Sequence, residues 1–547
     1  MRARRITPGL ADAPSDVDLV VIGLGVTGAG VALDAAARGL RVLAVDAVDL
    51  AFGTSRWSSK LVHGGLRYLA SGQVAVARES AIERGVLMEV TAPHLTEPMA
   101  TLVPLGAAVG RPTALLTAAG LRAGDVLRRS AGTGSDTLPG PRRLDAAGAL
   151  RLAPGLRRDG LRGGLLGWDG RLEDDARLVV TIARTAAQHG AHVRTRARVV
   201  AASGRRVVLR DELSGAHHEV HTQAVVNAAG VWAGEITPEV RLRPSRGTHL
   251  VLGRDTLPGL RAGVFVPIPG SRNRFVLVLP QPDGRVYVGL TDEPVTGPVP
   301  DVPEPTEAEV RFLLEVAASA FERPLRRTDV VGAFAGLRPL LDTGTGATAD
   351  LSRRHAVLTG GGIVSVVGGK LTTYRRMAEE AVDAALAEAG PTLARAADPC
   401  RTARLPLAGA APRPVLAALT ARLHQRLGPG GVRLVRRFGA DAEAVLDVAR
   451  ATTGLDDEQL AAALPTSAAS GVEAPTVAEI VVGLTHEGAA DADDLLDRRT
   501  RLGLVTADRA AARGVVQEWV DRSAQWRGAG ARGVGEVLDS PTRPPSL

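Results

Sequence analysis

The clearest pattern along the chain is a pair of short apolar runs near its N-terminus, joined by a glycine-rich turn and a helix-like segment. Residues 19–22 and, after Arg41, residues 42–45 are apolar without alternation, as in strands that are buried on both faces. The turn between them has the spacing G-x-G-x-x-G, formed by Gly23, Gly25 and Gly28. The pattern predicts a strand, a tight turn, a helix and a second strand over residues 18–46.

The periodicity changes twice further along the chain. Helical spacing at 74–90 and 175–189 is mixed with strand-like runs at 193–211 and 224–233. Strand alternation over 240–335, with a helix near 306–320, predicts an antiparallel sheet. A strand at 355–359, a glycine-rich loop and a helix at 372–387 follow. Residues 100–165 look like loops between short helical patterns. From about residue 400 the spacing is helical, with helices expected at 414–428, 431–450, 476–487, 491–501 and 506–525.

Composition narrows the class of protein. The 66 Lys and Arg and the 59 Asp and Glu give a net charge of +7, which suits an anionic substrate or an anionic membrane surface. No nucleic-acid-binding motif accompanies this charge, so we expect no nucleic acid as partner. Cys400 is the only cysteine, which excludes an intrachain disulfide and a cysteine metal site. No apolar run is long enough for a transmembrane helix, no signal-peptide core follows the basic N-terminus, and no amphipathic anchor stands out. We therefore expect a cytoplasmic protein without metal.

Only two of the 66 basic residues are lysines, Lys60 and Lys370, and the other 64 are arginines. A lysine ammonium is more compact than a guanidinium and loses its proton more readily. Each lysine lies in a glycine-rich stretch, 58–69 or 360–375, that also holds one of the three tyrosines. Chance would explain either lysine alone, because lysine is usually a surface residue. The shared setting favours two sites that need an ammonium, and we expect the lysines to converge at the reacting group.

The glycine turn has the chemistry of a dinucleotide site. The first glycine permits the turn, the second lets the backbone approach a pyrophosphate, and the third lets the helix pack closely on the strand. The helix N-terminus would hold the phosphates. Asp46 ends the second strand, where a carboxylate accepts hydrogen bonds from an adenosine ribose. These residues do not choose between NAD, NADP and FAD, and a helix packed on a strand with incidental glycines is the alternative.

Nine motifs follow the glycine turn in a specific order. They are SSKLVHGGLRYL (58–69), APHL (92–95), DDARL (174–178), NAAGVW (227–232), RGTHLVL (246–252), GLTD (289–292), GLRPL (336–340), GGKLTTYR (368–375) and THEG…DLLDRRTRLGL (485–504). In this order and spacing the chain resembles the FAD-dependent, aerobic glycerol-3-phosphate dehydrogenase family over nearly its whole length. It departs from the family at Asp46, Arg56–Trp57, 96–101 and Arg246. These departures concern flavin seating and surface loops rather than the reaction.

The resemblance implies an α/β fold with a Rossmann-like FAD-binding domain of the glutathione-reductase and amino-acid-oxidase type. An antiparallel-sheet substrate domain and a C-terminal α-helical domain complete it. The FAD-binding domain is expected to be discontinuous, over 16–90, 155–238 and 350–390. The substrate domain is expected at 91–154 and 239–349, and the helical domain at 400–525. Residues 1–15 and 528–547 are expected to be disordered tails.

The resemblance also implies the reaction, a step of glycerol metabolism. Hydride transfer from C2 of sn-glycerol 3-phosphate to N5 of FAD would give dihydroxyacetone phosphate, and a membrane quinone would take the electrons. The protein would then be peripheral on the inner face of the cytoplasmic membrane, and a homodimer is compatible with this setting. Three alternatives stay open: an oxidase that uses O2, an amine- or amino-acid-oxidising flavoenzyme of the same fold, and a non-catalytic flavin- or lipid-binding protein.

Site residues follow from the resemblance position by position. His249 is the expected base, since an ordinary histidine pKa near 6.5 suits proton transfer, and Lys370 is its rival. A structural histidine in the sheet is the alternative reading of His249. Arg338 is expected to bind the substrate phosphate, and the remaining substrate contacts are expected from Arg67, Tyr68, His249 and Arg353. The expected cofactor-binding residues are Gly23, Gly25, Gly28, Asp46, Thr54, Ser55, Ser58, Ser59, Lys60, His63, Gly64, Gly65, Ala229, Gly230, Gly369, Lys370, Leu371 and Thr372.

Overall fold

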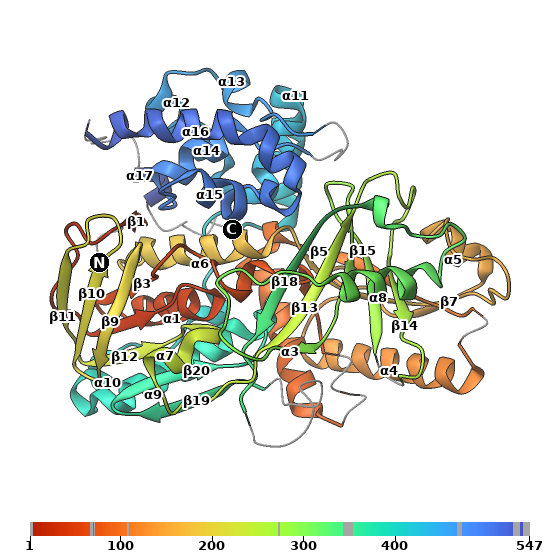
Figure 1. Ribbon diagram of the computed structural model, residues 1–547, viewed down its shortest axis with the longest axis horizontal. Helices are drawn as coiled ribbons and strands as arrows, with labels where there is room; N and C mark the ends of the chain where they lie inside the picture. Colours follow the sequence, from red (N-terminus) through yellow and green to blue (C-terminus); the bar gives the residue numbers. More distant parts are fainter. Residues whose placement is uncertain are drawn as a thin grey trace.

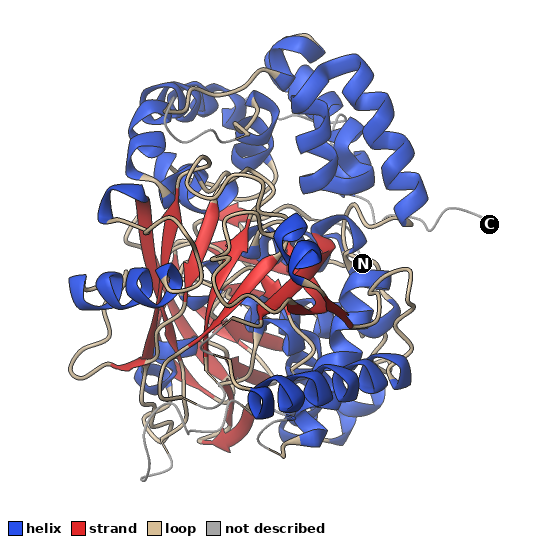
Figure 2. Cartoon of the chain, turned by 90° about the vertical axis from the view of Figure 1, so that its right-hand side faces the viewer, coloured by secondary structure: helices blue, strands red, loops and turns tan. Residues whose placement is uncertain are grey.

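The computed structural model describes residues 4–65, 69, 72–106, 109–271, 274–342, 354–467, 473–528 and 536–539. Within them the chain forms two large sheets and a group of C-terminal helices that lies on top of both (Figure 1). Figure 2 shows the strands gathered in the interior with helices around them. The cavity described below lies where the two sheets meet.

The first sheet has seven strands in the order β1-β8-β3-β2-β12-β20-β19. All neighbours are parallel except β19 and β20. Its strands are Thr7–Pro8 (β1), Leu19–Ile22 (β2), Val42–Val45 (β3), His192–Thr195 (β8), Ala224–Asn227 (β12), Ala356–Gly360 (β19) and Ile363–Val367 (β20). The strand order reverses at β2, so the turn after it opens at the edge where such sheets bind ligands.

Both faces of this sheet are covered, which explains the unbroken apolar runs. Leu19 and Val21 belong to a core shared with three helices, α1 (Val26–Ala37), α6 (Asp175–Gln188) and α9 (Tyr374–Ala389). Val20 and Ile22 point to the opposite face. There a three-stranded antiparallel sheet packs on them, formed by β9 (Ala197–Ser203), β10 (Arg206–Asp211) and β11 (His217–His221).

The second sheet runs in the order β17-β13-β16-β15-β14-β5-β7-β4, with β18 also paired to β13 and β6 to β7. Its strands are Leu61–Val62 (β4), Thr96–Pro104 (β5), Arg142–Leu144 (β6), Gly164–Leu172 (β7), Ser245–Leu252 (β13), Gly263–Pro267 (β14), Phe275–Pro280 (β15), Val286–Gly289 (β16), Glu293–Pro294 (β17) and Val330–Arg338 (β18). Its neighbours are antiparallel apart from β14 and β5. Helix α8 (Glu307–Ala318) packs on it through Val310 and Leu313.

Further helices connect the strands and form the C-terminal group. They are α3 (Val74–Val86), α4 (Arg111–Ser130), α5 (Ala146–Leu152), α7 (Ala233–Ile236), α10 (Pro391–Ala396), α11 (Arg413–Phe438), α12 (Ala442–Thr453), α13 (Asp457–Ala461), α14 (Val477–Thr485), α15 (Ala492–Asp494), α16 (Thr506–Gly528) and α17 (Glu536–Asp539). The C-terminal group has its own core, which includes Phe438, Leu446 and Val481. A capping box of Thr476 and Glu479 begins α14.

The elements predicted around the glycine turn, the helix at 175–189 and the strands over 240–335 are confirmed. Three other predictions are wrong. Residues 100–165 contain most of strand β5 and the 20-residue helix α4 instead of loops. The glycine-rich loop after 359 contains β20, because 363–367 pair with β12 and β19. The helix expected at 431–450 is divided at Gly439, whose φ of 57° is outside the helical region.

The prediction of disordered tails is wrong at 4–15 and at 536–539. Strand β1 pairs with β8, so the N-terminal segment extends the first sheet. Leu538 is buried, and its carbonyl accepts a hydrogen bond from Gln188 Nε2 at 2.7 Å. Arg5 and Asp539 form an ion pair at 3.0 Å. The N-terminal segment is thus ordered by strand pairing, and the C-terminal segment by its contacts with Gln188 of α6, the core of the C-terminal helices and Arg5. The other residues of these two tails lie outside the described residues, apart from Gly528 at the end of α16.

Buried charges fasten the C-terminal helices to the loop after β3. The carboxylate of Asp49 accepts hydrogen bonds from Arg498 Nε at 2.5 Å and from Arg499 Nη2 at 2.8 Å. Arg499 also donates to the carbonyl of Glu487, whose carboxylate pairs with Arg177 of α6. Burial alone would raise the pKa of Asp49, but the charges of Arg499 and Arg498 outweigh it and lower that pKa to about 2. The loop at Asp49 leads directly into the cavity wall.

Candidate functional site

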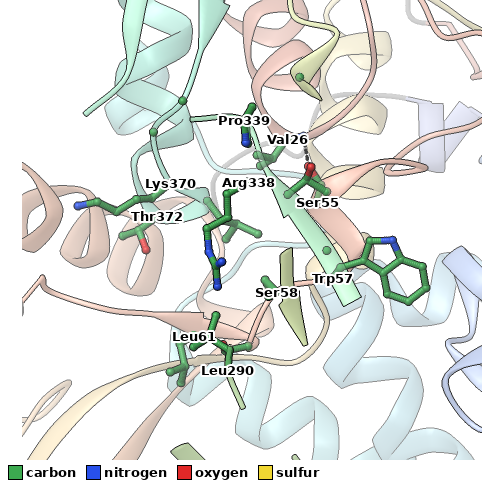
Figure 3. A pocket seen from close by; sticks show the side chains of 18 of the residues that line it. Val26, Ser55, Trp57, Ser58, Leu61, Leu290, Arg338, Pro339, Lys370 and Thr372 are labelled. Atoms are coloured by element: carbon green, nitrogen blue, oxygen red, sulfur yellow. Dashed lines mark hydrogen bonds between the residues drawn. The ribbon is translucent and has the colours of Figure 1, made fainter. Parts of the chain in front are cut away.

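A cavity of about 1060 Å³ runs from the carboxyl edge of the first sheet to the face of the second (Figure 3). Its wall combines the turn after β2, the loop 46–63, strands β13 and β18, and the glycine-rich stretch 368–372. Segments that are far apart in the sequence therefore meet at one site.

The turn after β2 has the geometry that a pyrophosphate needs. Gly23 has a φ of 93°, and a Cβ on it would lie 2.7 Å from the carbonyl oxygen of Ala228. A Cβ on Gly28 would overlap the carbonyl oxygen of Gly23, so only glycine lets α1 pack this closely. The N–H of Val26, in the first turn of α1, donates to Ser55 Oγ at 2.9 Å (Figure 3). The N-terminus of α1 thus faces the cavity between backbone and hydroxyl groups.

Asp46 lies at the end of β3, as predicted, and lines the cavity. Its two oxygens accept hydrogen bonds from the N–H groups of Leu24 at 2.8 Å and Val48 at 2.9 Å. Burial raises the pKa of Asp46 to about 6. Each carboxylate oxygen has a second lone pair, so the group can still accept from a ribose. The turn and this carboxylate fit the ADP part of a dinucleotide.

Strands β13, β16 and β18 form the floor of the cavity at its other end. Across β13 and β18 the direct pairs are Ser245 with Arg338, Gly247 with Gly336, and His249 with Phe334. Residues directly opposite in antiparallel strands point to the same face. A Cβ on Gly247 would overlap the Arg338 guanidinium, and a Cβ on Gly289 of β16 would overlap the His249 ring. The glycines therefore leave the space in which these two side chains lie.

His249 is buried and has one polar partner at its ring. Its Nε2 lies 2.8 Å from Ser59 Oγ, and its ring stacks on Phe334 with centroids 4.9 Å apart. Its Nδ1 has no hydrogen-bond partner among the described residues. Burial, followed by the charges of Lys60 and Arg338, lowers the pKa of His249 to about 3. The imidazole is therefore neutral at physiological pH, but its pKa lies well below the value near 6.5 on which the prediction of a base rested.

Arg338 lies at the end of β18 with its guanidinium over the floor. It donates to Ser245 Oγ at 3.1 Å and to the carbonyl of Thr291 at 3.0 Å. The hydroxyl of Ser245 in turn donates to Asp292. These contacts fix a forked donor at the cavity wall, which suits recognition of a phosphate or carboxylate.

Lys370 lines the cavity near the N-terminus of α9. Its ammonium donates to Ser80 Oγ of α3 at 2.7 Å. In Figure 3 its side chain extends away from Arg338. Gly369, Leu371 and Thr372 line the cavity beside it.

The structure corrects the expectation for Lys60. The side chain is buried behind the cavity wall, where its Nζ donates to Asp175 Oδ2 at 2.6 Å. Lys60 is absent from the cavity wall that the described residues form. The prediction that the two lysines converge at the reacting group is therefore wrong, because Asp175 at the start of α6 draws Lys60 to the other side.

The other predicted residues fall into three groups: on the cavity wall, away from it, and outside the described residues. Those on the cavity wall are Thr54, Ser55, Ser58, Ser59, His63, Ala229 and Gly230. Gly64 and Gly65 are not on the wall formed by the described residues, and the N–H of Gly64 donates to Asp169 Oδ1 at 3.0 Å. Arg67, Tyr68 and Arg353 lie outside the described residues.

Four residues of the site were not predicted: Ser245, Asp292, Phe334 and Trp57. The first two hold Arg338, and Phe334 supports the His249 ring. Strand alternation could have indicated Phe334, which lies four residues before Arg338 and so on the same face. Trp57 stacks on Phe334 at 5.8 Å, and nothing in the sequence brings these two together.

The part of the cavity wall at helix α4 is mostly apolar, and we call it the apolar arm. It is formed by Leu116, Gly120, Leu121, Phe265, Ile268, Phe275 and Leu277, together with Thr113 and Thr117. On the outside, α4 exposes Leu115 (71%), Leu116 (65%) and Val126 (63%) together with three arginines at 111, 122 and 129. The acidic residue of this helix, Asp125, is buried against Arg128 at 2.8 Å. Across the described residues, no helix combines the length and the hydropathy that a membrane span requires.

Two family models match the chain. The model described as FAD dependent oxidoreductase matches residues 18–375, and the C-terminal domain of alpha-glycerophosphate oxidase matches residues 400–529. "Glycerol-3-phosphate dehydrogenase 1" of Mycobacterium tuberculosis is 50% identical over 521 residues, which is 94% of this chain and 96% of that protein. "Glycerol-3-phosphate dehydrogenase" of Pseudomonas aeruginosa is 34% identical over 502 residues, or 89% and 92% of the two chains.

Solved structures agree with these matches. The glycerol-3-phosphate dehydrogenase of Bacillus halodurans, complexed with FAD, superposes with a TM-score of 0.70 at 26% identity, over 97% of this chain and 92% of its own. The FAD-bound L-alpha-glycerophosphate oxidase of Mycoplasma pneumoniae shares the fold, with a TM-score of 0.52 at 18% identity over 68% of this chain and 94% of its own. The dinucleotide that fits the turn after β2 is therefore FAD.

Proposed function

This chain belongs to the FAD-dependent glycerol-3-phosphate dehydrogenases, and we propose that it oxidises sn-glycerol 3-phosphate to dihydroxyacetone phosphate and passes the electrons to a membrane quinone. The observation that carries this proposal is the placement of Arg338 and His249 on one face of β18 and β13, within the cavity that begins at the glycine turn. FAD, when bound in this cavity, would supply a two-electron acceptor for the hydride on C2 of the substrate. The residues of the chain hold the substrate and take the proton from the hydroxyl group on its C2.

Arg338 binds the phosphate of the substrate in this proposal. Its guanidinium is held by Ser245 and the carbonyl of Thr291, so its orientation is set before the substrate arrives. A planar fork of N–H donors matches the oxygens of a phosphate better than a point charge does. Arg67, Tyr68 and Arg353 stay predictions as further substrate contacts.

His249 takes the proton from the substrate hydroxyl. It is neutral because burial and the neighbouring cations Lys60 and Arg338 lower its pKa to about 3. A dianionic phosphate on Arg338 offsets one of these cations, so substrate binding raises the pKa of His249 and makes it a stronger base. Lys370, the rival base, donates to Ser80 and extends away from Arg338 (Figure 3). We assign it to charge stabilisation beside the cofactor.

We propose that the three domains have the residue ranges expected from the sequence. The FAD would be held by Gly23, Gly25, Asp46, Ser55 and the stretch 369–372, all on the cavity wall. The substrate would lie over strands β13 and β18. A homodimer stays a prediction.

The electron acceptor is proposed to enter through the apolar arm. That arm lies at α4, whose outer face combines exposed apolar side chains with arginines and no exposed acid. Such a face is typical of helices that lie on an anionic membrane. A quinone dissolved in the membrane would meet the arm at Leu116. The protein would then be peripheral on the inner face of the cytoplasmic membrane.

The decisive experiment is anaerobic flavin reduction by the purified holoenzyme. Glycerol 3-phosphate should bleach the flavin absorbance, while glycerol, glycine and proline should not. The reduced enzyme is then mixed either with a short-chain quinone or with dissolved oxygen. We expect fast reoxidation by the quinone and little peroxide from oxygen.

Two outcomes would change this proposal. Peroxide formation as fast as quinone reduction would make the protein an oxidase. The match of residues 400–529 to the C-terminal domain of alpha-glycerophosphate oxidase is the reason to test this alternative. A flavin that glycerol 3-phosphate leaves oxidised would remove the substrate assignment altogether.

A further inference from the structure

Lys60 is held by three acceptors that converge on one nitrogen. Its Nζ donates to Asp175 Oδ2 at 2.6 Å, to the carbonyl of Arg56 at 3.1 Å and to the carbonyl of Ser58 at 3.3 Å. An ammonium carries three donors on a single atom and can serve all three. A guanidinium is planar, wider and built for parallel acceptors, so it does not fit this arrangement. This geometry explains why a lysine stands here in a chain whose other basic residues, Lys370 apart, are arginines.

The same contacts fix the turn that carries Ser59. The Asp175 oxygen that pairs with Lys60 also accepts from the backbone N–H of Ser58 at 2.9 Å and from its hydroxyl at 2.7 Å. Lys60 has a φ of 57°, a strained value for a non-glycine residue, and its own N–H donates to Ser58 Oγ at 3.0 Å. Ser59 stands between these two anchored residues, and its hydroxyl lies 2.8 Å from His249 Nε2. Its position is therefore set from behind the wall.

We infer that Lys60, paired with Asp175, is a positioning residue for His249: it fixes the turn that holds the Ser59 hydroxyl on Nε2, and its positive charge close to the ring opposes protonation of the imidazole. This inference rests on the proposed function only for the role of His249 in catalysis. The hydrogen bond and the charge effect are properties of the protein itself.

The charge of Lys60 acts on the ring from close by. Its Nζ lies 5.1 Å from the centroid of the Phe334 ring, the same ring on which His249 stacks at 4.9 Å. The other groups around the ring are Arg338, whose charge acts in the same direction, Asp175, which acts against it, and Tyr287, whose buried ring meets Phe334 edge-on at 5.7 Å. Removal of the lysine charge leaves Asp175 facing the imidazole, so protonation of His249 becomes easier.

The C-terminal helices take part in this arrangement. Arg501 donates to the carbonyl of Arg56 at 2.6 Å, the acceptor that it shares with Lys60. Its guanidinium also lies 3.6 Å from Asp175 Oδ1. The turn 56–60 is thus held from two sides, by α6 and by the segment after α15.

The test measures the imidazole directly. Ring-¹⁵N-labelled histidine is introduced into the holoenzyme, and the His249 resonance is assigned by its loss in H249Q. In the wild type we expect a neutral ring with one fixed tautomer down to low pH. In K60M the pKa of His249 should rise by about one unit or more, and in K60R it should stay low because the charge remains. In S59A the ring should lose its fixed tautomer.

Kinetics separate position from charge. In K60R the rate of flavin reduction by glycerol 3-phosphate should fall about tenfold with an unchanged acid limb in the pH profile, since the turn moves but the charge stays. In K60M the acid limb should move to higher pH. The matched control is R38M, which removes the buried pair of Arg38 and Asp34 (2.7 Å) away from the cavity. It should lower thermal stability without moving the acid limb or the His249 resonance.

Three results would overturn the inference: an unchanged His249 pKa in K60M, a fixed tautomer in S59A, or an acid-limb shift of equal size in R38M. If K60M does not fold with FAD, K60R and S59A decide together: a wild-type rate of flavin reduction in K60R or a fixed tautomer in S59A would overturn the inference. If glycerol 3-phosphate does not reduce the flavin of the wild-type enzyme, the proposed function is refuted. The ¹⁵N measurement still tests the inference about Lys60, because it needs no turnover.

Discussion

At the scale of single residues, glycines shape the substrate floor as much as charged groups do. Gly247, Gly289 and Gly336 lie beside Arg338 and His249 on three adjacent strands. Each has a near neighbour where a Cβ would stand: the Arg338 guanidinium, the His249 ring and, at 2.6 Å, Trp57 Cβ. The positions of the functional side chains thus depend on the absence of side chains opposite them.

Gly289→Ala should displace the His249 ring and slow flavin reduction by about 10². Gly247→Ala should push the flexible Arg338 side chain aside and raise KM more than it lowers kcat. Stopped-flow and steady-state kinetics measure the two effects. Gly514→Ala is the control, because Gly514 lies on α16 with open space at its Cβ position. It should leave the kinetics unchanged, and equal losses in all three variants would refute the steric explanation.

Arg338→Ala should raise KM for glycerol 3-phosphate at least about tenfold while FAD stays bound, since a hydrogen-bonded charge is lost at the phosphate. The KM of Arg338→Lys should lie between those of the wild type and of Arg338→Ala, because lysine keeps the positive charge but lacks the planar fork of donors. Flavin content by absorbance and initial rates provide the measurement. An unchanged KM in Arg338→Ala would remove this residue from the phosphate site.

Arg338, His249 and Lys370 line the cavity, and each could be picked out from the sequence because it stands in a motif of recognisable composition and spacing; their roles stay predictions. Lys60 was misplaced, because nothing in a linear sequence indicates that Asp175, 115 positions away, captures the ammonium. Similarly, the stacking of Trp57 on Phe334 depends on a tertiary contact between β18 and the loop after β3. Local motifs predict which residues matter, whereas the side of the wall on which they lie is decided by packing.

At the scale of elements, helix α4 has the least support from the rest of the fold. Of its 20 residues only Asp125 and Arg128 are buried, and its outer face carries Leu115, Leu116 and Val126. Figure 1 shows it along the edge of the second sheet, on the opposite side of the molecule from the C-terminal helices. We propose this exposed apolar face as the membrane contact.

L115D/L116D should weaken binding to anionic phospholipid vesicles by at least about tenfold, because two exposed apolar side chains that would insert into the membrane are lost. Arg122→Glu should weaken it too and should reduce its dependence on salt. Vesicle co-sedimentation measures both. Leu213→Asp, at another exposed leucine (56%), is the matched control and should bind as the wild type does. Equal binding of all variants would exclude α4 as the contact.

The element predictions failed for definable reasons. Strand β5 reads TEPMATLVP, and its prolines argue against a strand, yet it pairs along nine residues with β7. Helix α4 has glycines at 120 and 124, which weaken a helical pattern in isolation. By contrast, β2 and α1 were predicted correctly because turn chemistry, periodicity and burial all indicate the same structure there.

At the scale of the whole molecule, the C-terminal helices and the FAD-binding part are joined by buried charges. Asp49→Asn should destabilise the protein by about 3–5 kcal/mol, since it leaves Arg498 and Arg499 buried without their main partner. Denaturant unfolding with FAD fluorescence and far-UV circular dichroism measures this. Asp16 pairs with Arg41, and its side chain is 69% exposed. Asp16→Asn should therefore change the free energy of unfolding by less than about 1 kcal/mol. Similar values for the two variants would contradict the coupling.

Acid should weaken the contact between Asp49 and the two arginines Arg498 and Arg499. The pKa values of Asp49 and Glu487 are lowered to about 2 by the arginines around them, although burial opposes this. Between about pH 4 and pH 2 the unfolded chain therefore binds more protons than the folded one, and stability falls as the pH falls through this window. Unfolding curves at stepwise pH should show this loss, and Asp49→Asn should show a smaller one.

The bond between Asp49 and Arg498–Arg499 has a consequence for synthesis of the protein. The ribosome makes Asp49 within the first tenth of the chain and its two counter-ions within the last tenth. A product of premature termination therefore carries a carboxylate that its own fold would bury without neutralisation. Such a product lacks the two guanidinium groups that hold the carboxylate of Asp49, so its loop after β3 should be less stable than in the full chain.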